Sequence, residues 1–195
     1  MKPTNRKDAT FKMVYSLDAL QNEYQNGKVY KFLFFWGHTP PPNRSINQSC
    51  LSQWWIQDFE IDGVFYLCAE QYMMAEKARL FNDDEMLEQI MQAALPKDMK
   101  AYGRAVRNFD QSTWNTHCFE IVKRASRAKF TQNPGLLEFL LKTQKRILVE
   151  ASPRDRIWGI GMGAKNPNAE NPLKWRGQNL LGFALTEVRD EVLRM

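Results

Sequence analysis

The sequence predicts a mainly α-helical α+β fold, arranged as a single compact domain with a few short strands and one β-hairpin. Three observations support this class. Much of the chain carries apolar residues at helical spacing, in segments separated by proline, glycine or asparagine. The pair Asp62-Gly63 stands between two apolar runs and is typical of a hairpin turn. With 195 residues, 44% hydrophobic and 25% charged, the chain is long enough to bury the core of one domain.

The start of the chain is predicted to be an N-terminal arm, residues 1–28, ahead of a domain that covers residues 29–195. The arm is polar, with a short helix expected near residues 16–25. It lacks an apolar segment with a cleavage site, so no secretory signal is expected. No stretch of about 18 apolar residues occurs, so no membrane span is expected. Three cysteines at unrelated spacings indicate reduced thiols, and together these features predict a cytoplasmic protein.

Strands are predicted at four places. Residues 29–36 form an apolar and aromatic run that ends at a glycine. Residues 51–61 and 64–68 flank Asp62-Gly63 and are expected to pair as a hairpin. Residues 146–151 are predicted to form another short strand. These few short strands are what makes the predicted class α+β rather than all-α.

Helical spacing and stop signals predict six helices after the hairpin. Asp84 and Ser112 are expected to cap the second and the fourth of these helices. Residues 152–172 are rich in glycine, asparagine and proline and are expected to form a loop, of a length that is usually functional or disordered in a compact domain. The six helices are expected at residues 69–81, 85–93, 96–107, 113–129, 136–145 and 179–195.

The scarcity of histidine narrows the chemistry that the chain can perform. His38 and His117 are the two histidines, and the sequence has no C-x-x-C and no H-E-x-x-H motif. A zinc site is therefore not expected, and neither is a triad of the Ser-His-Asp kind. The glycine pattern after residue 158 is not a dinucleotide fingerprint, and no cofactor is expected. Chemistry must come from carboxylates, lysine, aromatic rings and the backbone.

The net charge of +5 makes an anionic ligand plausible without identifying it. The basic residues are spread along the chain, apart from a local group on the fourth predicted helix. Two interpretations of that group stay open: a solvated helix face, or attraction to a phosphate-bearing ligand or nucleic acid. The group consists of Lys123, Arg124, Arg127 and Lys129.

Glu70 and Lys77 form the first candidate constellation. They are seven residues apart in one predicted helix, which places both side chains on one face about 10 Å apart along the axis. Met73 and Met74 lie between them, and a partly desolvated carboxylate and amine would have shifted pKa values and raised reactivity. Two unrelated charges on a solvated helix would give the same pattern.

The second candidate constellation is the segment from Glu150 to Gly163. A strand end followed by Gly159 and Gly161 can present backbone N–H groups to an anion, although a structural turn with a core tryptophan, Trp158, fits as well. Asp155 can stabilise an oxocarbenium ion or orient water, and it can equally be a turn or cap aspartate. Other tryptophans, Trp36, Trp114 and Trp175, are candidates for stacking or for the core.

A series of motifs in this order is the most specific feature of the chain. The motifs are Phe35-Trp36-Gly37, Leu51-Ser52-Gln53-Trp54, Ile61-Asp62-Gly63, Ala69-Glu70-Gln71-Tyr72-Met73-Met74-Ala75-Glu76-Lys77-Ala78, Lys129-Phe130, Asn133-Pro134, Leu148-Val149-Glu150-Ala151-Ser152, Asp155-x-x-Trp158-Gly159-x-Gly161 and Gly177-x-Asn179-x-Leu181-Gly182. In this combination the sequence resembles the NADAR family, also called YbiA-like, over about residues 30–190. Gln53-Trp54 departs from the family's more frequent Asn-Phe and is expected to alter the substrate pocket.

The resemblance implies a compact, mainly helical fold and cleavage of N-glycosidic bonds to ribose. Substrates in the family include phosphorylated ribosyl-aminopyrimidine intermediates of riboflavin synthesis and ADP-ribose attached to guanine, so ADP-ribosylated nucleic acid is a candidate partner. By position, Glu70, Trp114, Asp155 and Trp158 match residues associated with the family's active site. Lys77 matches the lysine proposed to attack the anomeric carbon of ribose.

The same resemblance supplies the other candidate binding residues. Trp36, Gly37 and Asn179 lie in matching motifs and are expected to contact substrate, with Gly159 and Gly161 holding its phosphate. Two other functions stay open. A non-catalytic module that binds ADP-ribose or a nucleotide would use the same pocket, and a basic nucleic-acid protein would show steeply salt-dependent binding.

Overall fold

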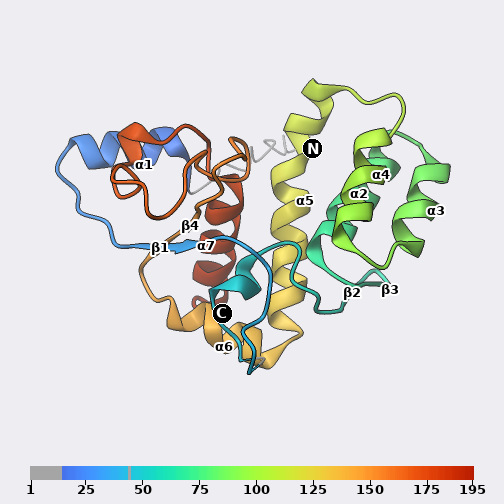
Figure 1. The fold of residues 1–195 in the computed structure, drawn as a ribbon, viewed down its shortest axis with the longest axis horizontal. Helices are drawn as coiled ribbons and strands as arrows, with labels where there is room; N and C mark the ends of the chain where they lie inside the picture. Colours follow the sequence, from blue (N-terminus) through green and yellow to red (C-terminus); the bar gives the residue numbers. More distant parts are fainter. Residues whose placement is uncertain (1–14, 44) are drawn as a thin grey trace, which may run out of the picture.

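The computed structural model describes residues 15–43 and 45–195, and it confirms a mainly helical α+β fold (Figure 1). The α-helices in this part of the chain are α1 (Leu17–Gln25), α2 (Ala69–Leu80), α3 (Asp84–Gln92), α4 (Pro96–Ala105), α5 (Gln111–Thr131), α6 (Pro134–Lys142) and α7 (Leu180–Val192). The strands are β1 (Phe32–Phe35), β2 (Phe59–Ile61), β3 (Val64–Tyr66) and β4 (Ile147–Glu150), and the short 3-10 helices are η1 (Gln48–Leu51) and η2 (Pro172–Lys174). No helix of the described chain is long and apolar enough to cross a membrane.

The long helix α5 stands between the two halves of the molecule (Figure 1). On one side it packs against α2, which in turn packs against α3 and α4. On the other side it packs against α7, which covers β4. Buried positions such as Trp114, Cys118, Val122 and Ala125 recur every three or four residues along α5, as the sequence pattern predicted. The core therefore continues through α5 from one half to the other.

Two helix caps differ from the prediction. Asp83, not Asp84, caps α3 by accepting a hydrogen bond from the N–H of Met86 at 3.3 Å. The Asp83 carboxylate also forms an ion pair with Arg107 at 2.6 Å, and this tertiary bond favours Asp83 over Asp84 as the capping residue. Asp110, not Ser112, caps α5 by accepting from the N–H of Thr113 at 2.7 Å.

The hairpin forms at the predicted turn, but its first strand is much shorter than predicted. Asp62 and Gly63 both have positive φ, 52° and 78°, as the tight turn between β2 and β3 requires. Residues 51–58 are not a strand. The buried ammonium of Lys129 donates to the carbonyls of Cys50 and Ser52, at 2.7 and 2.8 Å, and these carbonyls are thereby removed from any ladder.

The second sheet positions the candidate site. β1 and β4 are parallel, with Phe35 opposite Glu150, so both strands end at the same edge. Side chains of the α7 segment cover the outer edge of β4: Asn179 accepts from the N–H of Glu150 at 2.9 Å and donates to the carbonyl of Leu148 at 3.0 Å. Gly182 allows this close approach, because a Cβ there would lie 2.1 Å from the Leu148 oxygen.

Part of the predicted N-terminal arm, residues 1–14, lies outside the described residues. The helix expected near residues 16–25 is present as α1, and the Ser16 side chain caps it by accepting from the N–H of Ala19. Leu20 of α1 is buried in the core, and Gln21 donates to the carbonyl of Pro172 at 2.9 Å. The described end of the arm is thus packed on the rest of the chain.

Candidate active site

Candidate residues from both constellations lie where β1 and β4 end and α2 begins, whereas Lys77 lies further along α2, beside Trp114 of α5. Glu150 is the last residue of β4, and the glycine-rich segment continues from it. Trp36 and Gly37 follow β1 at the same edge of the sheet. Glu70 lies in the first turn of α2 and interacts electrostatically with Asp155, which brings the two sequence constellations together.

Glu70 is a buried carboxyl, only 4% exposed. Its backbone N–H donates to the carbonyl of Gln53 at 3.0 Å, which ties α2 to the segment before the hairpin. Burial raises the pKa of Glu70 to about 7, although the charge of Lys100 and a hydrogen bond from the Trp54 side chain work in the opposite direction. At neutral pH this group therefore exchanges a proton easily, unlike a solvated surface glutamate.

The departure from the family pattern, Gln53-Trp54, directly adjoins Glu70. Trp54 hydrogen-bonds to the Glu70 carboxyl, and its ring lies 5.6 Å from the ammonium of Lys100. Gln53 is 7% exposed, and its amide nitrogen contacts the sulfur of Met73 at 3.5 Å. Its Oε1 is buried and has no hydrogen-bond partner among the described residues. A buried acceptor of this kind is expected where a ligand supplies the donor.

Asp155 is held by its own turn. Its Oδ1 accepts from the N–H groups of Ile157 and Trp158, at 2.9 and 2.8 Å, and its carbonyl accepts from Gly161 at 2.9 Å. Its charge contributes to raising the pKa of Glu70. Asp155 is therefore a turn aspartate, as one of its two interpretations predicted, and its charge also acts on Glu70.

Glu150 and Lys100 are site residues that the sequence reasoning did not select. Burial raises the pKa of Glu150 to about 8, with a further contribution from Asp155, while Lys100 acts in the opposite direction. In the sequence, Glu150 stood only at the start of the glycine-rich segment and within one of the matched motifs, without a role of its own. No spacing rule along the chain connects Glu150 to Glu70, because the end of α2 at Leu80 and the start of β4 at Ile147 are 67 positions apart.

Lys77 occupies a separate aromatic compartment two turns along α2. Its ammonium donates to the carbonyl of Gly103 at 2.7 Å and lies 4.1 Å from the ring centre of Phe109 and 5.7 Å from that of Trp114. Burial lowers the pKa of Lys77, and the charge of Arg104 lowers it further. The same Arg104 also acts on Glu70, so it faces both parts of the site.

The candidate tryptophans differ in exposure. Trp114 is buried, 8% exposed, and lies beside Lys77. Trp36 is 63% exposed and thus open to a ligand. Trp158 is half-buried and packs against the core. Trp175 is buried and donates from its indole nitrogen to the carbonyl of Ala169 at 2.7 Å, so the structure gives it a role in holding the long loop.

The glycine-rich segment and Asn179 serve the fold directly. The N–H groups of Ile160 and Gly161 donate to the carbonyls of Glu150 and Asp155, both at 2.9 Å, so they are not free to bind an anion. A Cβ at Gly159 would lie 2.8 Å from the Glu150 carbonyl oxygen. Asn179 is fully buried with its side chain on β4. Gly37 has φ +86° and open space around its Cα.

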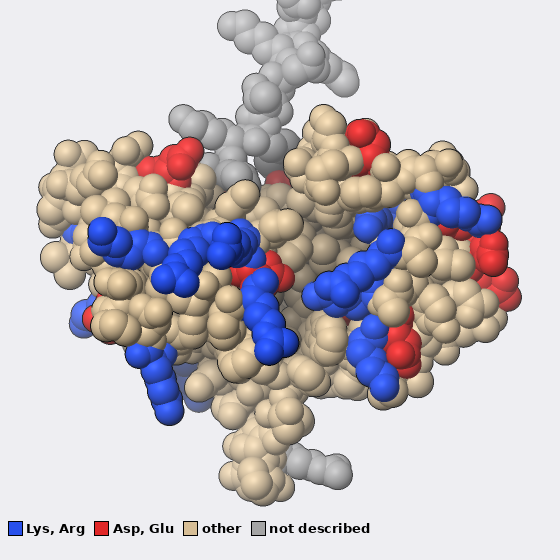
Figure 2. Space-filling view, turned by 45° about the horizontal axis from the view of Figure 1, so that its top comes forward, with Lys and Arg blue, Asp and Glu red and all other residues tan. Residues whose placement is uncertain are grey.

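The members of the basic group on α5 are all engaged by partners within the described chain, although Arg124 and Arg127 are solvent-exposed. Lys123 pairs with Glu187 and Glu191 at 2.7 Å, and Arg127 also pairs with Glu191. The remaining two members, Arg124 and Lys129, bind Asp62 and the carbonyls near η1. Figure 2 shows further lysines and arginines on both sides of a hollow between the two halves, with acidic side chains between them.

Within residues 15–43 and 45–195, no three histidine, cysteine, aspartate or glutamate side chains are placed to hold one ion. Cys50, Cys68 and Cys118 are free and buried. The site can offer a buried glutamate of raised pKa, a second, half-buried glutamate, a fixed aspartate and a lysine of lowered pKa, beside several aromatic rings.

Comparisons with known proteins agree on one family. The model of the NADAR domain matches residues 34–193. The chain is 41% identical over 166 residues to "N-glycosidase R617" of Acanthamoeba polyphaga mimivirus, covering 83% of this chain and 96% of that protein. It is 29% identical over 133 residues to "N-glycosidase YbiA" of Escherichia coli, covering 68% of this chain and 74% of that protein.

A solved structure shares the fold. The NMR structure of E. coli YbiA superposes with a TM-score of 0.68 and 24% identity, covering 86% of this chain and 88% of that one. The protein irg-1 of Caenorhabditis elegans is 38% identical over 129 residues, which cover 65% of this chain and 61% of that protein. With its family model matched over most of its length, this chain belongs to the NADAR family.

Proposed function

We propose that the protein is an N-glycosidase that hydrolyses the bond between a base and a phosphorylated ribose. The observation that carries this proposal is the buried Glu70 beside Asp155, because a buried carboxyl with a pKa raised to about 7 and a second carboxylate facing it is typical of functional sites. Relatives named N-glycosidase, one of them 41% identical, support the same reaction class.

The cleavage step needs stabilisation of positive charge on the sugar. As the bond to the base breaks, C1′ of the ribose acquires oxocarbenium character, which a nearby carboxylate stabilises. Glu70 and Asp155 are the two groups proposed for this role. Trp36, Trp114 and Trp158 are proposed to contact the base or sugar, because aromatic faces suit both planar bases and a developing cation.

Lys77 is proposed to act on the sugar carbon. A neutral amine can attack C1′ and open the sugar through a Schiff base, which water then hydrolyses. The lowered pKa of Lys77 between Phe109 and Trp114 increases the fraction of neutral amine. Borohydride reduction in the presence of substrate should trap this adduct on Lys77, and its absence would remove the covalent route while leaving hydrolysis by water.

The substrate is proposed to carry phosphate, either as ADP-ribose on guanine or as a ribosyl-aminopyrimidine phosphate. The basic side chains around the hollow in Figure 2 support an anionic substrate, and they also suit ADP-ribosylated nucleic acid. Because the N–H groups of Ile160 and Gly161 are occupied, phosphate contacts are assigned to basic side chains rather than to the glycine segment.

Turnover on the two substrate classes tests the function. The protein is incubated with ADP-ribosylated guanine and, separately, with a ribosyl-aminopyrimidine phosphate, and free base is measured over many enzyme equivalents. Catalytic release of base from either substrate supports the N-glycosidase and identifies its substrate class. Saturable binding without release would instead assign the chain as a non-catalytic ADP-ribose or nucleotide-binding module.

A further inference from the structure

We propose that Glu150 is the acid that protonates the departing base, a role separate from those of Glu70 and Asp155. This inference rests on the proposed N-glycosidase function. It adds the residue that supplies the proton, which neither the family resemblance nor the helical spacing had indicated.

The position of Glu150 is fixed more firmly than that of any flexible surface acid. Its backbone N–H donates to Asn179, its carbonyl accepts from Ile160 at 2.9 Å, and its strand pairs with β1. The side chain leaves the end of β4 toward the site, where it interacts with Glu70 from α2, Lys100 from α4 and Asp155 from the long loop. These are the charged groups that face it.

The carboxyl oxygen Oε2 of Glu150 is buried and has no hydrogen-bond partner among the described residues. An ionised carboxylate in such a place would lack donors, which is costly, whereas the protonated acid needs only one acceptor. A nitrogen of the substrate's base can provide that acceptor. Gln53 also presents a buried, unpartnered oxygen in the segment that contacts Glu70, so two orphan groups mark the same region as a ligand site.

The other two carboxyls are already committed to different partners. Asp155 has its Oδ1 occupied by two backbone N–H groups, and Glu70 receives the indole hydrogen bond of Trp54. Both arrangements supply donors, which suit a carboxylate that stabilises positive charge. Two glutamates close enough to interact do not both ionise readily, so one of them retains its proton at neutral pH. We assign that proton to Glu150, because its Oε2 lacks the hydrogen-bond donors that an ionised carboxylate needs, whereas Glu70 receives one from Trp54.

The proton balance of the step is simple. The bond from C1′ to the base nitrogen breaks, its electron pair stays on that nitrogen, and the nitrogen takes the carboxyl proton of Glu150. Water then adds to C1′ through its oxygen and gives up one proton, which returns to the Glu150 carboxylate. The products are the free base and the ribose hydroxyl, and Glu150 ends in its starting state.

Replacement of Glu150 by glutamine tests this role, since the isosteric amide cannot give up a proton. The kcat for base release should fall about 100-fold or more with KM changed only a few-fold. The wild-type fall of kcat above about pH 8 should disappear in Glu150→Gln. Glu60→Gln, which changes an exposed glutamate of the hairpin, is the matched control and should behave as wild type. A Glu150→Gln enzyme with wild-type kcat and pH profile would overturn the proposal.

A second measurement does not depend on turnover. Carboxyl carbon resonances are recorded against pH in protein labelled with ¹³C-glutamate, and the Glu150 signal is assigned by its loss in Glu150→Gln. A midpoint well above 6 supports the proton-holding role, and a midpoint near that of a solvated glutamate overturns it. If the wild-type protein releases no base from either substrate, the proposed function fails, and the titration still reports separately on Glu150.

Discussion

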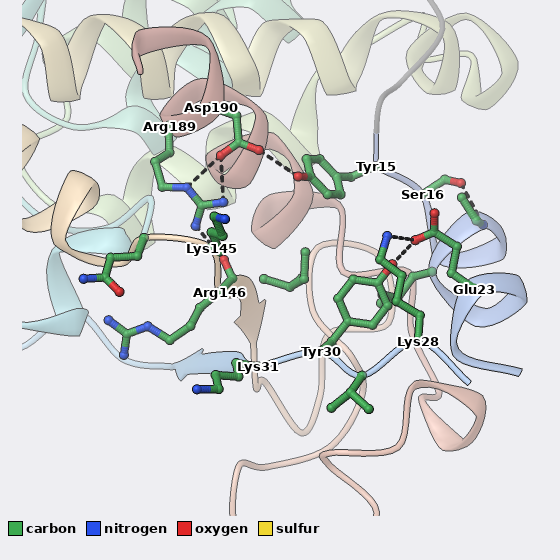
Figure 3. A pocket seen from close by; sticks show the side chains of 15 residues that line it. Tyr15, Ser16, Glu23, Lys28, Tyr30, Lys31, Lys145, Arg146, Arg189 and Asp190 are labelled. Carbon is green, nitrogen blue, oxygen red and sulfur yellow. Dashed lines mark hydrogen bonds and ion pairs between the residues drawn. The ribbon is translucent and has the colours of Figure 1, made fainter. Parts of the chain in front are cut away.

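The two ends of the β1–β4 sheet differ in the charge that they carry, which is mainly basic at the amino ends and mainly acidic at the carboxyl ends. At the amino ends lies a cavity of about 1250 Å³, formed with α1 and the last turns of α7 (Figure 3). Its buried Arg189 is bound to Asp190 at 2.8 Å, Asp190 also accepts from the hydroxyl of Tyr15 at 2.7 Å, and Lys28 pairs with Glu23. At the carboxyl ends, Glu70, Glu150 and Asp155 repel one another.

The difference between the two ends indicates which of them is the functional site. The cavity at the amino ends holds two ion pairs that stabilise the fold, and its further basic residues, Lys31, Lys145 and Arg146, give it a net positive lining. A cluster of like charges with orphan oxygens lowers stability, and such clusters persist where substrate or reaction makes use of them. We therefore assign function to the acidic end, and the following predictions separate the two ends.

The largest effect is expected at Glu70. Glu70→Gln should lower kcat for base release by about 100-fold or more, because the amide cannot act as the charge-stabilising carboxylate. The variant should remain folded, since it removes a buried acid that is costly to ionise. Kinetics and thermal unfolding at pH 8 check both statements, and full activity in a folded Glu70→Gln protein would show that the carboxylate is not needed.

The next effect is a loss of stability with rising pH. Glu70 and Glu150 have folded-state pKa values of about 7 and 8, above those of an unfolded glutamate. Between about pH 5 and 8 the folded state thus binds more protons than the unfolded state, and each group lowers the unfolding free energy by up to about 1.4 kcal/mol per pH unit. Denaturant unfolding measures the slope, which should become shallower in Glu70→Gln; an unchanged slope would contradict the shifted values.

At the amino ends of the sheet, Asp190→Asn should affect stability and not catalysis. The change removes the charge that faces Arg189, which is only 1% exposed, and weakens the bond from Tyr15. A loss of about 1–3 kcal/mol is expected, with Tm lower by several degrees. The kcat of the folded variant should equal that of wild type. A selective loss of kcat would place function at this end.

The smallest effect is expected for Trp54→Phe, which keeps the ring and removes the indole N–H. Since the hydrogen bond from Trp54 holds the pKa of Glu70 down, its loss should raise that pKa further. The acidic limb of the pH–rate profile should move to higher pH, and the rate at pH 7 should fall several-fold. Phe34→Leu, a change at a half-buried ring of β1, is the packing control, and it should not shift the acidic limb of the pH–rate profile.

Local features were readable from the sequence. The turn at Asp62-Gly63 depends on positive φ at two adjacent residues, and the shared helix face of Glu70 and Lys77 depends on helical geometry alone. Features set by distant partners were not readable. At the start of the segment that is not a strand, residues 51–58, the carbonyls of Cys50 and Ser52 are bound by Lys129, which lies far along the chain.

The dependence on distant partners also explains which site residues could be predicted from the sequence and which could not. Glu150 meets Glu70 only because β4 pairs in parallel with β1 and the loop with Asp155 folds back onto it. Phe109, in the segment between α4 and α5, packs against the ammonium of Lys77 in α2. Such neighbours follow from the topology of the fold rather than from spacing along the chain.

The central claim is that the acidic end of the sheet is catalytic and that the cavity at the other end is structural. The most direct test measures base release, at one pH near 7.5, by wild type, Glu70→Gln and Asp190→Asn in parallel, with the folded fraction of each known. The account predicts turnover by wild type and Asp190→Asn, and almost none by Glu70→Gln. Turnover by Glu70→Gln at the wild-type rate, or its loss in folded Asp190→Asn alone, would contradict it.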